Sequence, residues 1–361
     1  MNFISIKKLI IKILLKIPLV RNIISYSGRY RKRTFEKKES IRILNSLDVF
    51  GAQKTLIVYD YSISPPTFGD YFGVVMLARY FVTLEINVDF VIIDGQYRDD
   101  WGLCDKKSKS EMILMHIKTA KLILDKSYSN IEILQWMEFK EKYFDLVDSK
   151  LCFPVRDGIL TRTIPLYTHA YNIVNYLCAE HDKDFIDKFL LSHEMLIDKV
   201  EITMPTKPYI TWGCRYSKVW GKERNLTEIE FLKIYQRLRN LYPDHEIMIV
   251  SDMIGCEYFK RIASQNNIQC LFSKNYSNNL FSDGVLILGS TYFYILRGGG
   301  ISVFPQFSRV PHERVTYLMH ESIWSDGRGA SWASNDQVYR PLLPGKQFDS
   351  SYLPTISSTL N

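Results

Sequence analysis

Residues 54–95 contain the strand–helix–strand pattern that decides the fold: KTLIVYDYS (54–62), DYFGVVMLARYFVTLE (70–85) and INVDFVIIDG (86–95). The first and last stretches are β-rich, and the middle stretch has the length and composition of a helix. Near-continuous apolar strands, such as residues 89–93, are typical of parallel sheets that helices cover on both faces. These residues therefore predict the first unit of an α/β domain.

The alternation of strands and helices continues through the rest of the chain. A region with two prolines, residues 201–208, is a candidate linker, and Thr227 and Glu230 have the spacing of a capping box that opens a helix. The predicted helices are residues 110–125, 132–145, 228–241, 256–265, 279–289 and a segment that begins near 301, with a further helical region around residues 170–198. The further predicted strands are residues 208–213, 245–251, 269–272, 291–297 and 314–318.

Length and composition favour two packed domains. The chain has 361 residues, and 46% of them are hydrophobic, which excludes global disorder. The six cysteines are scattered without a C-x-x-C pair, which argues against a zinc ribbon or a dithiol redox motif. A dispersed set of this kind is typical of buried free thiols in a protein of a reducing compartment. We expect an arm (1–40), a first domain (41–200), a second domain (207–335) and a tail or return segment (336–361).

The positive charge is concentrated in the amino-terminal arm. Residues 1–40 contain eleven basic and two acidic residues, so this segment carries +9, whereas the whole chain carries +7 and the remainder −2. A basic body wrapped along nucleic acid would instead spread its charge over a domain face. The distribution therefore argues against nucleic acid as the main partner.

The arm has the pattern of a helix that lies on a membrane surface. In FISIKKLIIKILLKIPLV (3–20), Lys8, Lys12 and Lys16 form one stripe on an otherwise apolar helix. Because a lysine recurs every four residues, the apolar run is too short for a helix that crosses the membrane. The cluster RYRKR (29–33) adds attraction to anionic lipids. We expect a protein held peripherally on the cytoplasmic face of the membrane. The alternatives are that the helix packs on this protein or on a partner subunit, or that RYRKR binds nucleic acid.

The Gly69–Asp70 pair, which follows the first strand in the first of two tandem α/β units, resembles a motif of the GT-B glycosyltransferases, most closely of the heptosyltransferase-like group. The resemblance implies two Rossmann-like domains that face a central cleft. It also implies that Asp70 is the general base that accepts the proton of the acceptor hydroxyl. The alternative is that Asp70 only caps the helix.

The loop after the first strand of the second domain is rich in basic residues, in TWGCRYSKVWGKERNLTEIEF (211–231). A metal-independent transfer requires positive charge and helix amides to stabilise the departing diphosphate. The resemblance implies that Arg215 and Lys218 supply this charge. The alternative is a solvated basic loop.

The segment YFYILRGGGISVFPQFSRVPHERVTYL (292–318) corresponds to the family's donor-binding region. The family has an Asp-Thr-Gly-Pro-like turn, whereas this chain has Arg297-Gly298-Gly299-Gly300. The transferred sugar is therefore not fixed as heptose. Arg297 is a candidate contact for phosphate or for a sugar carboxylate. Three glycines allow a ligand to approach the backbone closely. Pro305 would confine the following helix to a short piece. Glu313 is a candidate ribose contact, and a purely structural turn is the alternative.

The resemblance predicts a metal-independent glycosyltransferase with a nucleotide sugar as donor and a lipid-linked or oligosaccharide acceptor of surface-glycan synthesis, acting without a separate cofactor. No metal-binding motif is present in the sequence, and Asp99-Asp100 lacks DxD spacing. Two alternatives stay open. One is a polysaccharide pyruvyltransferase that uses phosphoenolpyruvate, and the other is a non-catalytic scaffold of a glycan assembly complex.

Overall fold

The computed structural model describes most of the two predicted domains. The described residues are 38–49, 51, 53–95, 106–149, 151–218, 224–277, 279–317, 337–342 and 352–355. Residues 1–37 of the arm, the Asp99-Asp100 pair and residues 219–223 of the basic loop lie outside them. Within the described ranges, no helix has the length and apolar character needed to cross a membrane.

The first domain is built on a four-stranded, all-parallel sheet with the order β3-β2-β1-β4. Its strands are β1 (Lys54–Asp60), β2 (Asn87–Asp94), β3 (Ser129–Gln135) and β4 (Leu151–Phe153). Helix α3 (Phe68–Thr83) crosses between β1 and β2 and is buried along nearly its whole length, which is typical of a helix that is apolar all round. The strand–helix–strand unit predicted over residues 54–95 is therefore confirmed.

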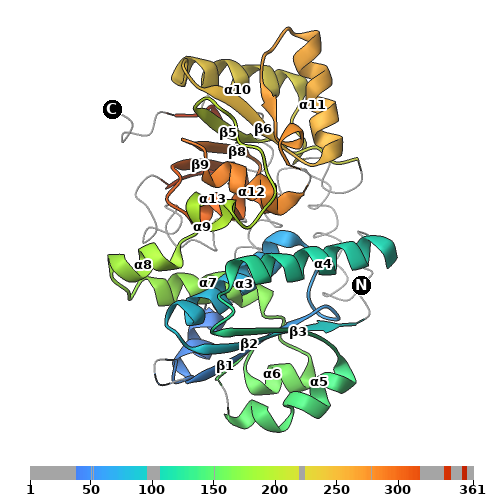
Figure 1. Ribbon diagram of the computed structural model, residues 1–361, viewed down its shortest axis with the longest axis vertical. Coiled ribbons are helices and arrows are strands. Elements are labelled where there is room, and N and C mark those ends of the chain that lie inside the picture. The colour runs from blue at the N-terminus through green and yellow to red at the C-terminus, as the bar shows by residue number, and fades with distance from the viewer. Residues whose placement is uncertain are drawn as a thin grey trace, which may run out of the picture.

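Most of the following helices lie around this sheet (Figure 1). They are α4 (Lys106–Ile123), α5 (Trp136–Tyr143), the 3-10 helix η2 (Asp145–Ser149), α6 (Arg156–Thr161), α7 (Tyr167–Cys178) and α8 (Lys183–Phe189). The next helix, α9 (His193–Ile197), lies beside α12 of the second domain (Leu280–Leu288), and its His193 ring hydrogen-bonds to the Val285 carbonyl at 3.3 Å.

One of the predicted helix boundaries in this domain is wrong. Residues 132–135 belong to the edge strand β3, and the helix there begins only at Trp136. The helical region predicted around 170–198 is confirmed, and it consists of three helices because Asp182 and Ser192 each cap a new helix start.

Arg79 of α3 joins three helices of the first domain through their carbonyl groups. Its guanidinium donates to the carbonyl oxygens of Ile123 at 2.9 Å, Lys188 at 2.8 Å and Phe189 at 2.5 Å. These carbonyls lie at the carboxyl ends of α4 and α8, where the helix dipole favours a cation. Burial lowers the pKa of Arg79 to about 10, so the side chain stays charged at neutral pH.

The second domain contains a six-stranded parallel sheet with the order β10-β9-β8-β5-β6-β7. Its strands are β5 (Tyr209–Gly213), β6 (Glu246–Val250), β7 (Leu271–Phe272), β8 (Phe293–Leu296), β9 (His312–Tyr317) and β10 (Gln337–Leu342). Its helices are α10 (Glu228–Leu241), α11 (Met253–Gln265), η4 (Ser273–Asn275), α12 (Leu280–Leu288), η5 (Gly300–Ser302) and α13 (Val303–Gln306). The predicted strands and helices of this half are confirmed, and α13 is as short as Pro305 predicts.

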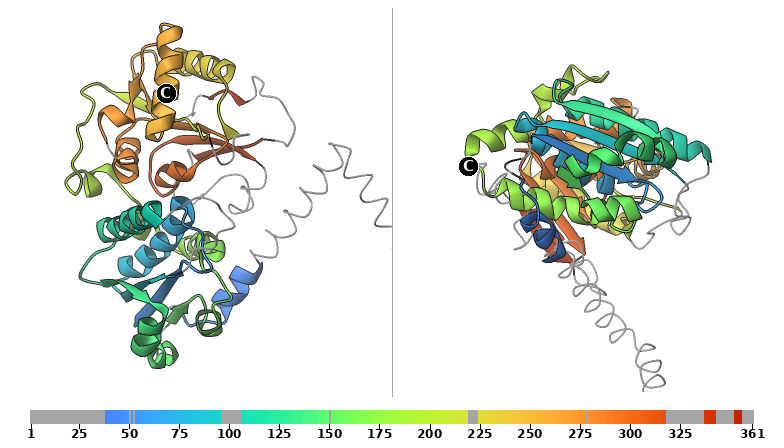
Figure 2. Two further views of the ribbon diagram at one scale, coloured as in Figure 1. Left: turned by 90° about the vertical axis from the view of Figure 1, so that its right-hand side faces the viewer. Right: turned by 90° about the horizontal axis from the view of Figure 1, so that it is seen from below.

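The two domains are joined by an aromatic contact between α3 and α13. The ring of Phe304 lies 5.8 Å from that of Phe68 and 5.0 Å from that of Phe72, and the ring of Phe307 lies 6.1 Å from that of Phe72. One apolar cluster thus continues from the first domain into the second. The two halves lie one above the other along the long axis, as the side view in Figure 2 also shows.

Candidate functional site

The second sheet has its topological switch point between β5 and β8. From β5 the chain proceeds outward to β6 and β7, and it then returns to build β8, β9 and β10 on the other side. In open parallel α/β sheets, ligands bind beyond the carboxyl ends of the strands at such a point. Residues 214–218 follow β5 and residues 297–300 follow β8, so both segments singled out from the sequence are brought to this position.

The glycine-rich turn has a backbone that glycine favours. Gly298 has a φ of 62°, in the left-handed region, and Arg297 before it has a φ of 64°. The turn leads directly into η5 and α13, and the Ser302 hydroxyl donates to the Gly299 carbonyl at 2.7 Å. The predicted strand–turn–helix arrangement after β8 is confirmed, and residues 298–300 form an ordered bend at the carboxyl edge of the sheet.

The first turn of α3 meets this glycine-rich turn across the domain boundary. A Cβ built on Gly69 would lie 3.6 Å from the Cα of Gly300, and a Cβ built on Gly300 would lie 3.6 Å from the backbone nitrogen of Gly69. Two stretches that are separated by more than two hundred residues in sequence therefore lie in backbone contact. Their contact places the first turn of α3, which contains Asp70, beside the glycine-rich turn at the carboxyl edge of the second sheet.

Asp70 is not the N-cap of α3. That position belongs to Thr67, and Asp70 lies three residues later, half-buried, with its carboxylate accepting a hydrogen bond from the Thr67 hydroxyl. The phenol of Tyr59 lies nearby: burial, with smaller contributions from Tyr61 and the Asp70 charge, raises its pKa well above the ordinary value. The simple capping interpretation of Asp70 is therefore wrong, whereas its catalytic role stays a prediction.

Arg297 is engaged in the interior of the second domain. Its guanidinium makes a two-pronged ion pair with Glu230 and donates to the Asn225 carbonyl at 3.0 Å. The Arg297 carbonyl in turn accepts from Arg224 at 3.1 Å and 3.2 Å. Burial tends to raise the pKa of Glu230, but the hydrogen bonds from Arg297 and Thr227 outweigh it and lower the pKa.

The predicted phosphate contact of Arg297 is not supported by this geometry. Its charge is already neutralised by Glu230, which is also the last residue of the capping box of α10. The pair therefore joins the turn after β8 to the start of α10.

Glu313 also has a structural environment. It is only 1% exposed, and its carboxylate accepts from the Tyr292 hydroxyl at 2.9 Å and from the backbone nitrogen of Thr355 at 2.8 Å. This carboxylate fastens residues 352–355 to the second sheet. The predicted ribose contact at Glu313 is therefore not supported, because the group lies inside the domain.

Arg215 and Lys218 lie where a ligand at the switch point would approach. Arg215 is half-buried and its carbonyl accepts from the Leu226 backbone, while Lys218 is exposed at the end of the described stretch. Ser217 and Asn225 hold the two sides of this loop together through two hydrogen bonds of 2.8 Å. The loop is thus tied to the base of α10, and the roles of both cations stay predictions.

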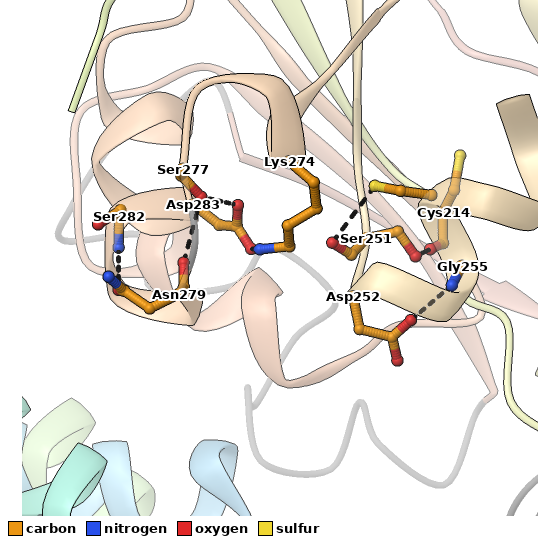
Figure 3. Close-up of polar contacts among 10 residues, drawn as sticks. Cys214, Ser251, Asp252, Gly255, Lys274, Ser277, Asn279, Ser282 and Asp283 are labelled. Carbon is orange, nitrogen blue, oxygen red and sulfur yellow. Dashed lines mark hydrogen bonds and ion pairs between the residues drawn. The ribbon is translucent and has the colours of Figure 1, made fainter.

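A polar cluster that the sequence analysis missed lies beyond β6 and β7 (Figure 3). Lys274 and Asp283 form a buried ion pair, and the Ser277 hydroxyl donates to the same carboxylate at 2.5 Å. Opposite them, Asp252 caps α11 at Gly255, and the Ser251 hydroxyl donates to the Cys214 carbonyl at 2.6 Å. Because Lys274 and Asp283 lie in different elements, only the fold brings them together.

The first domain has a small cavity at the carboxyl ends of β1 and β2. Asp60, Ser64 and Arg162 contribute its polar lining among mainly apolar side chains. Arg162 donates to the Asp60 carboxylate at 2.6 Å and 2.7 Å and lies 4.6 Å from the ring centroid of Trp136. In the described part of the chain, no group of three or more His, Cys, Asp or Glu side chains is arranged to hold a metal ion.

No protein-family model and no curated protein matches the chain. Among solved structures, the chain is similar to the E. coli heptosyltransferase WaaC with ADP, with a TM-score of 0.46 and 10% identity over 80% of this chain and 93% of that chain. It is similar to the E. coli ADP-heptose LPS heptosyltransferase II, with a TM-score of 0.45 and 10% identity over 81% and 91%. A family 9 glycosyl transferase from Veillonella parvula has a TM-score of 0.37 and 9% identity over 80% and 86%. Likeness at this level carries no argument about activity, so the function proposed below depends on the geometry of this chain.

Proposed function

We propose that the protein is a metal-independent glycosyltransferase that moves a sugar from a nucleotide-sugar donor to a lipid-linked or oligosaccharide acceptor of surface-glycan synthesis. The observation that carries the proposal is the backbone contact between Gly69 and Gly300. It brings a half-buried carboxylate of the first domain, Asp70, to the switch point of the second sheet. Donor and acceptor would then meet at the domain junction.

Asp70 would act as the general base in this arrangement. A base must lie within hydrogen-bond reach of the attacking hydroxyl, and a carboxylate in the first turn of a helix is stabilised in its charged form by the helix dipole. The hydrogen bond from Thr67 orients the carboxylate.

The leaving diphosphate would be stabilised at the carboxyl edge of the second sheet. Arg215 and Lys218 supply positive charge there, and the glycine-rich turn allows a ligand to approach the backbone at residues 298–300. Preorganised charge of this kind lowers the barrier for departure of a diphosphate without a metal ion. No separate cofactor is required for such a transfer.

The amino-terminal arm would hold the enzyme at the cytoplasmic face of an anionic membrane, where a lipid-linked acceptor is found. The support comes from the sequence of residues 3–33. The described chain begins in a helical stretch at residue 38, and Ser40 in that stretch is fixed to the first domain by a 2.9 Å hydrogen bond to His169. The arm would thus be anchored to the domain that takes the acceptor.

A thermal-shift screen tests the donor site. The full chain is heated with ADP, GDP, UDP, dTDP, CMP or phosphoenolpyruvate, because a ligand that binds only the folded state raises the melting temperature. Stabilisation by one nucleotide supports the proposal and identifies the base. A response to phosphoenolpyruvate alone would contradict it in favour of a pyruvyltransferase, and no response to any ligand would favour a scaffold.

Replacement of the base tests the catalytic half. With the donor identified, Asp70→Asn should lower sugar transfer by at least about a hundredfold, since general base catalysis contributes roughly 10²- to 10⁴-fold. Nucleotide binding should stay within about twofold of the wild type, because the proposed base acts on the acceptor hydroxyl and the substitution keeps the size of the side chain. Full transfer activity in Asp70→Asn would refute the assignment. Asp48→Asn, in an exposed loop, is the matched control.

A further inference from the structure

Arg314 of β9 is a half-buried cation with an incomplete set of partners. Its Nη1 donates to Gln306 Oε1 at 3.2 Å, while its Nε is buried and has no hydrogen-bond partner. Within the ranges that the structure describes, its guanidinium has no carboxylate within 4.0 Å. Arg162 and Arg297, by contrast, each have a two-pronged carboxylate pair.

Such an arrangement is unfavourable in the free protein. A buried donor without an acceptor loses its hydration and gains nothing in return, and buried charges are normally paired or bound to a ligand. A guanidinium fork matches the oxygens of a phosphate or a carboxylate, with which it forms short, charge-assisted hydrogen bonds. The chemistry of Arg314 therefore favours an oxyanion as the missing partner.

The position of Arg314 is next to the glycine-rich turn. Arg314 is in register with Ile295 on the neighbouring strand β8, and register partners project from the same face of a sheet. A Cβ built on Gly299 would lie 3.7 Å from the side chain of Ile295. Adjacent strands lie about 4.8 Å apart. The backbone of Arg314 is therefore about one strand spacing from that of Ile295, the residue whose side chain lies beside Gly299.

Gln306 fixes Arg314 on this side of the sheet. It is the last residue of α13, which begins three residues after Gly300, and it is only 2% exposed. The same short helix carries Phe304, which contacts α3 of the first domain. Arg314 therefore lies behind the segment that joins the glycine-rich turn to the domain junction.

We propose that Arg314, held by Gln306, binds an oxyanion of a substrate at the domain junction. This assigns to Arg314 the role that the sequence predicted for Arg297, whose charge Glu230 already neutralises. The identity of the substrate rests on the proposed function, and two sources provide the same chemistry. One is the diphosphate of the donor, and the other is an acidic group on a sugar of the donor or acceptor.

Two variants of the full chain remove the free charge in different ways. Gln306→Glu supplies a carboxylate at 3.2 Å from Arg314 with almost no change of shape, and Arg314→Gln deletes the cation. Arg309→Gln is the matched control, because it makes the same charge change at an exposed arginine that pairs with Asp187. Isothermal titration with pyrophosphate, with ADP, GDP and UDP, and with glucuronate measures the dissociation constants at one fixed salt concentration.

We expect pyrophosphate or glucuronate affinity to fall at least about tenfold in both Gln306→Glu and Arg314→Gln, as for the loss of one hydrogen bond to a charged group. Arg309→Gln should stay within about twofold of the wild type. A parallel loss for a nucleoside diphosphate identifies the donor as the source, and a loss confined to glucuronate identifies a sugar acid. Gln306→Glu should also unfold at the same or a higher temperature than the wild type, because it supplies the missing counter-ion.

Equal affinities of wild type and Gln306→Glu for every probe would overturn the inference. So would a clear fall in the melting temperature of Gln306→Glu, which would show that Arg314 is already compensated. The proposed function fails separately: if no nucleoside diphosphate binds the wild type while pyrophosphate or glucuronate binding depends on Gln306 and Arg314, the anion site stands without a nucleotide-sugar donor.

Discussion

Replacing Arg297 with methionine should destabilise the second domain and leave nucleotide binding intact. The side chains of Arg297 and Glu230 are 12% and 8% exposed, so the variant leaves a carboxylate buried without its cation. Removing one partner of a buried ion pair costs about 3–5 kcal/mol. For a domain of this size, that corresponds to a melting temperature lower by roughly 6–20 °C. Thermal and urea unfolding of the purified chain measure this loss.

A double-mutant cycle separates the ion pair from other effects. Glu230→Gln keeps an acceptor for the Thr227 backbone nitrogen, so the capping hydrogen bond at 2.8 Å is preserved while the charge is removed. The double variant Arg297→Met/Glu230→Gln should be more stable than Arg297→Met alone. The reasoning is refuted if Arg297→Met unfolds within about 2 °C of the wild type and its nucleotide affinity falls tenfold, since Arg297 would then be a ligand contact.

The same pair makes a prediction about pH. The pKa of Glu230 is lower in the folded chain than its ordinary value of 4.5, so its contribution to stability is complete above that value. The contribution is lost as the pH falls below 4.5 and the carboxylate becomes protonated. The stability difference between the wild type and the double variant, measured by urea unfolding at several pH values, should therefore shrink in acid. A difference that stays constant would contradict the assigned coupling.

Three further changes test other parts of the account. Arg79→Leu should lower the free energy of unfolding by about 3 kcal/mol or more, because it leaves carbonyls at the ends of α4 and α8 without a donor. Urea unfolding measures this loss, with Arg79→Lys, which keeps the charge, as the comparison. Gly284→Ala should cost about 1–3 kcal/mol, because a Cβ there would lie 2.3 Å from the ring of Phe304, whereas Gly299→Ala, with its nearest contact at 3.7 Å, should leave stability nearly unchanged. Deletion of residues 1–37 should leave a folded protein that no longer sediments with anionic liposomes, and unchanged sedimentation would refute the membrane role of the arm.

The parts of the fold that the sequence predicts well are those with strong local signals. The central strands β5, β6 and β8 of the second domain are mainly apolar runs, and Thr227 and Glu230 form the capping box that their spacing indicates. The helix predicted at residues 132–135 is wrong for a local reason. These residues belong to β3, a half-exposed edge strand that runs directly into α5. The helical composition of the residues that follow made the predicted helix begin too early. Its identity is fixed by pairing with β2, which is a tertiary contact.

The sequence predicted which segments meet at the candidate site, but it did not predict how their charged side chains are paired. The topology brings the turn after β8 next to the loop after β5, as the pattern of strands implies. The pairing of Arg297 with Glu230, 67 residues earlier, has no local signal. Glu313 is similar, because Thr355, whose backbone nitrogen donates a hydrogen bond to its carboxylate, lies 42 residues later in the tail. Arg314 was missed because a cation is recognised as unpaired only after the partners of its neighbours are known.

Hydrogen–deuterium exchange with and without the nucleotide identified in the thermal screen tests the central claim most directly. If donor binding occurs at the switch point, the nucleotide should slow exchange in peptides that cover residues 214–218 and 297–302 and in the first turn of α3. Protection confined to regions away from these segments, such as the outer faces of α10 and α11, would contradict the assignment of the donor site to the junction between Asp70 and the glycine-rich turn.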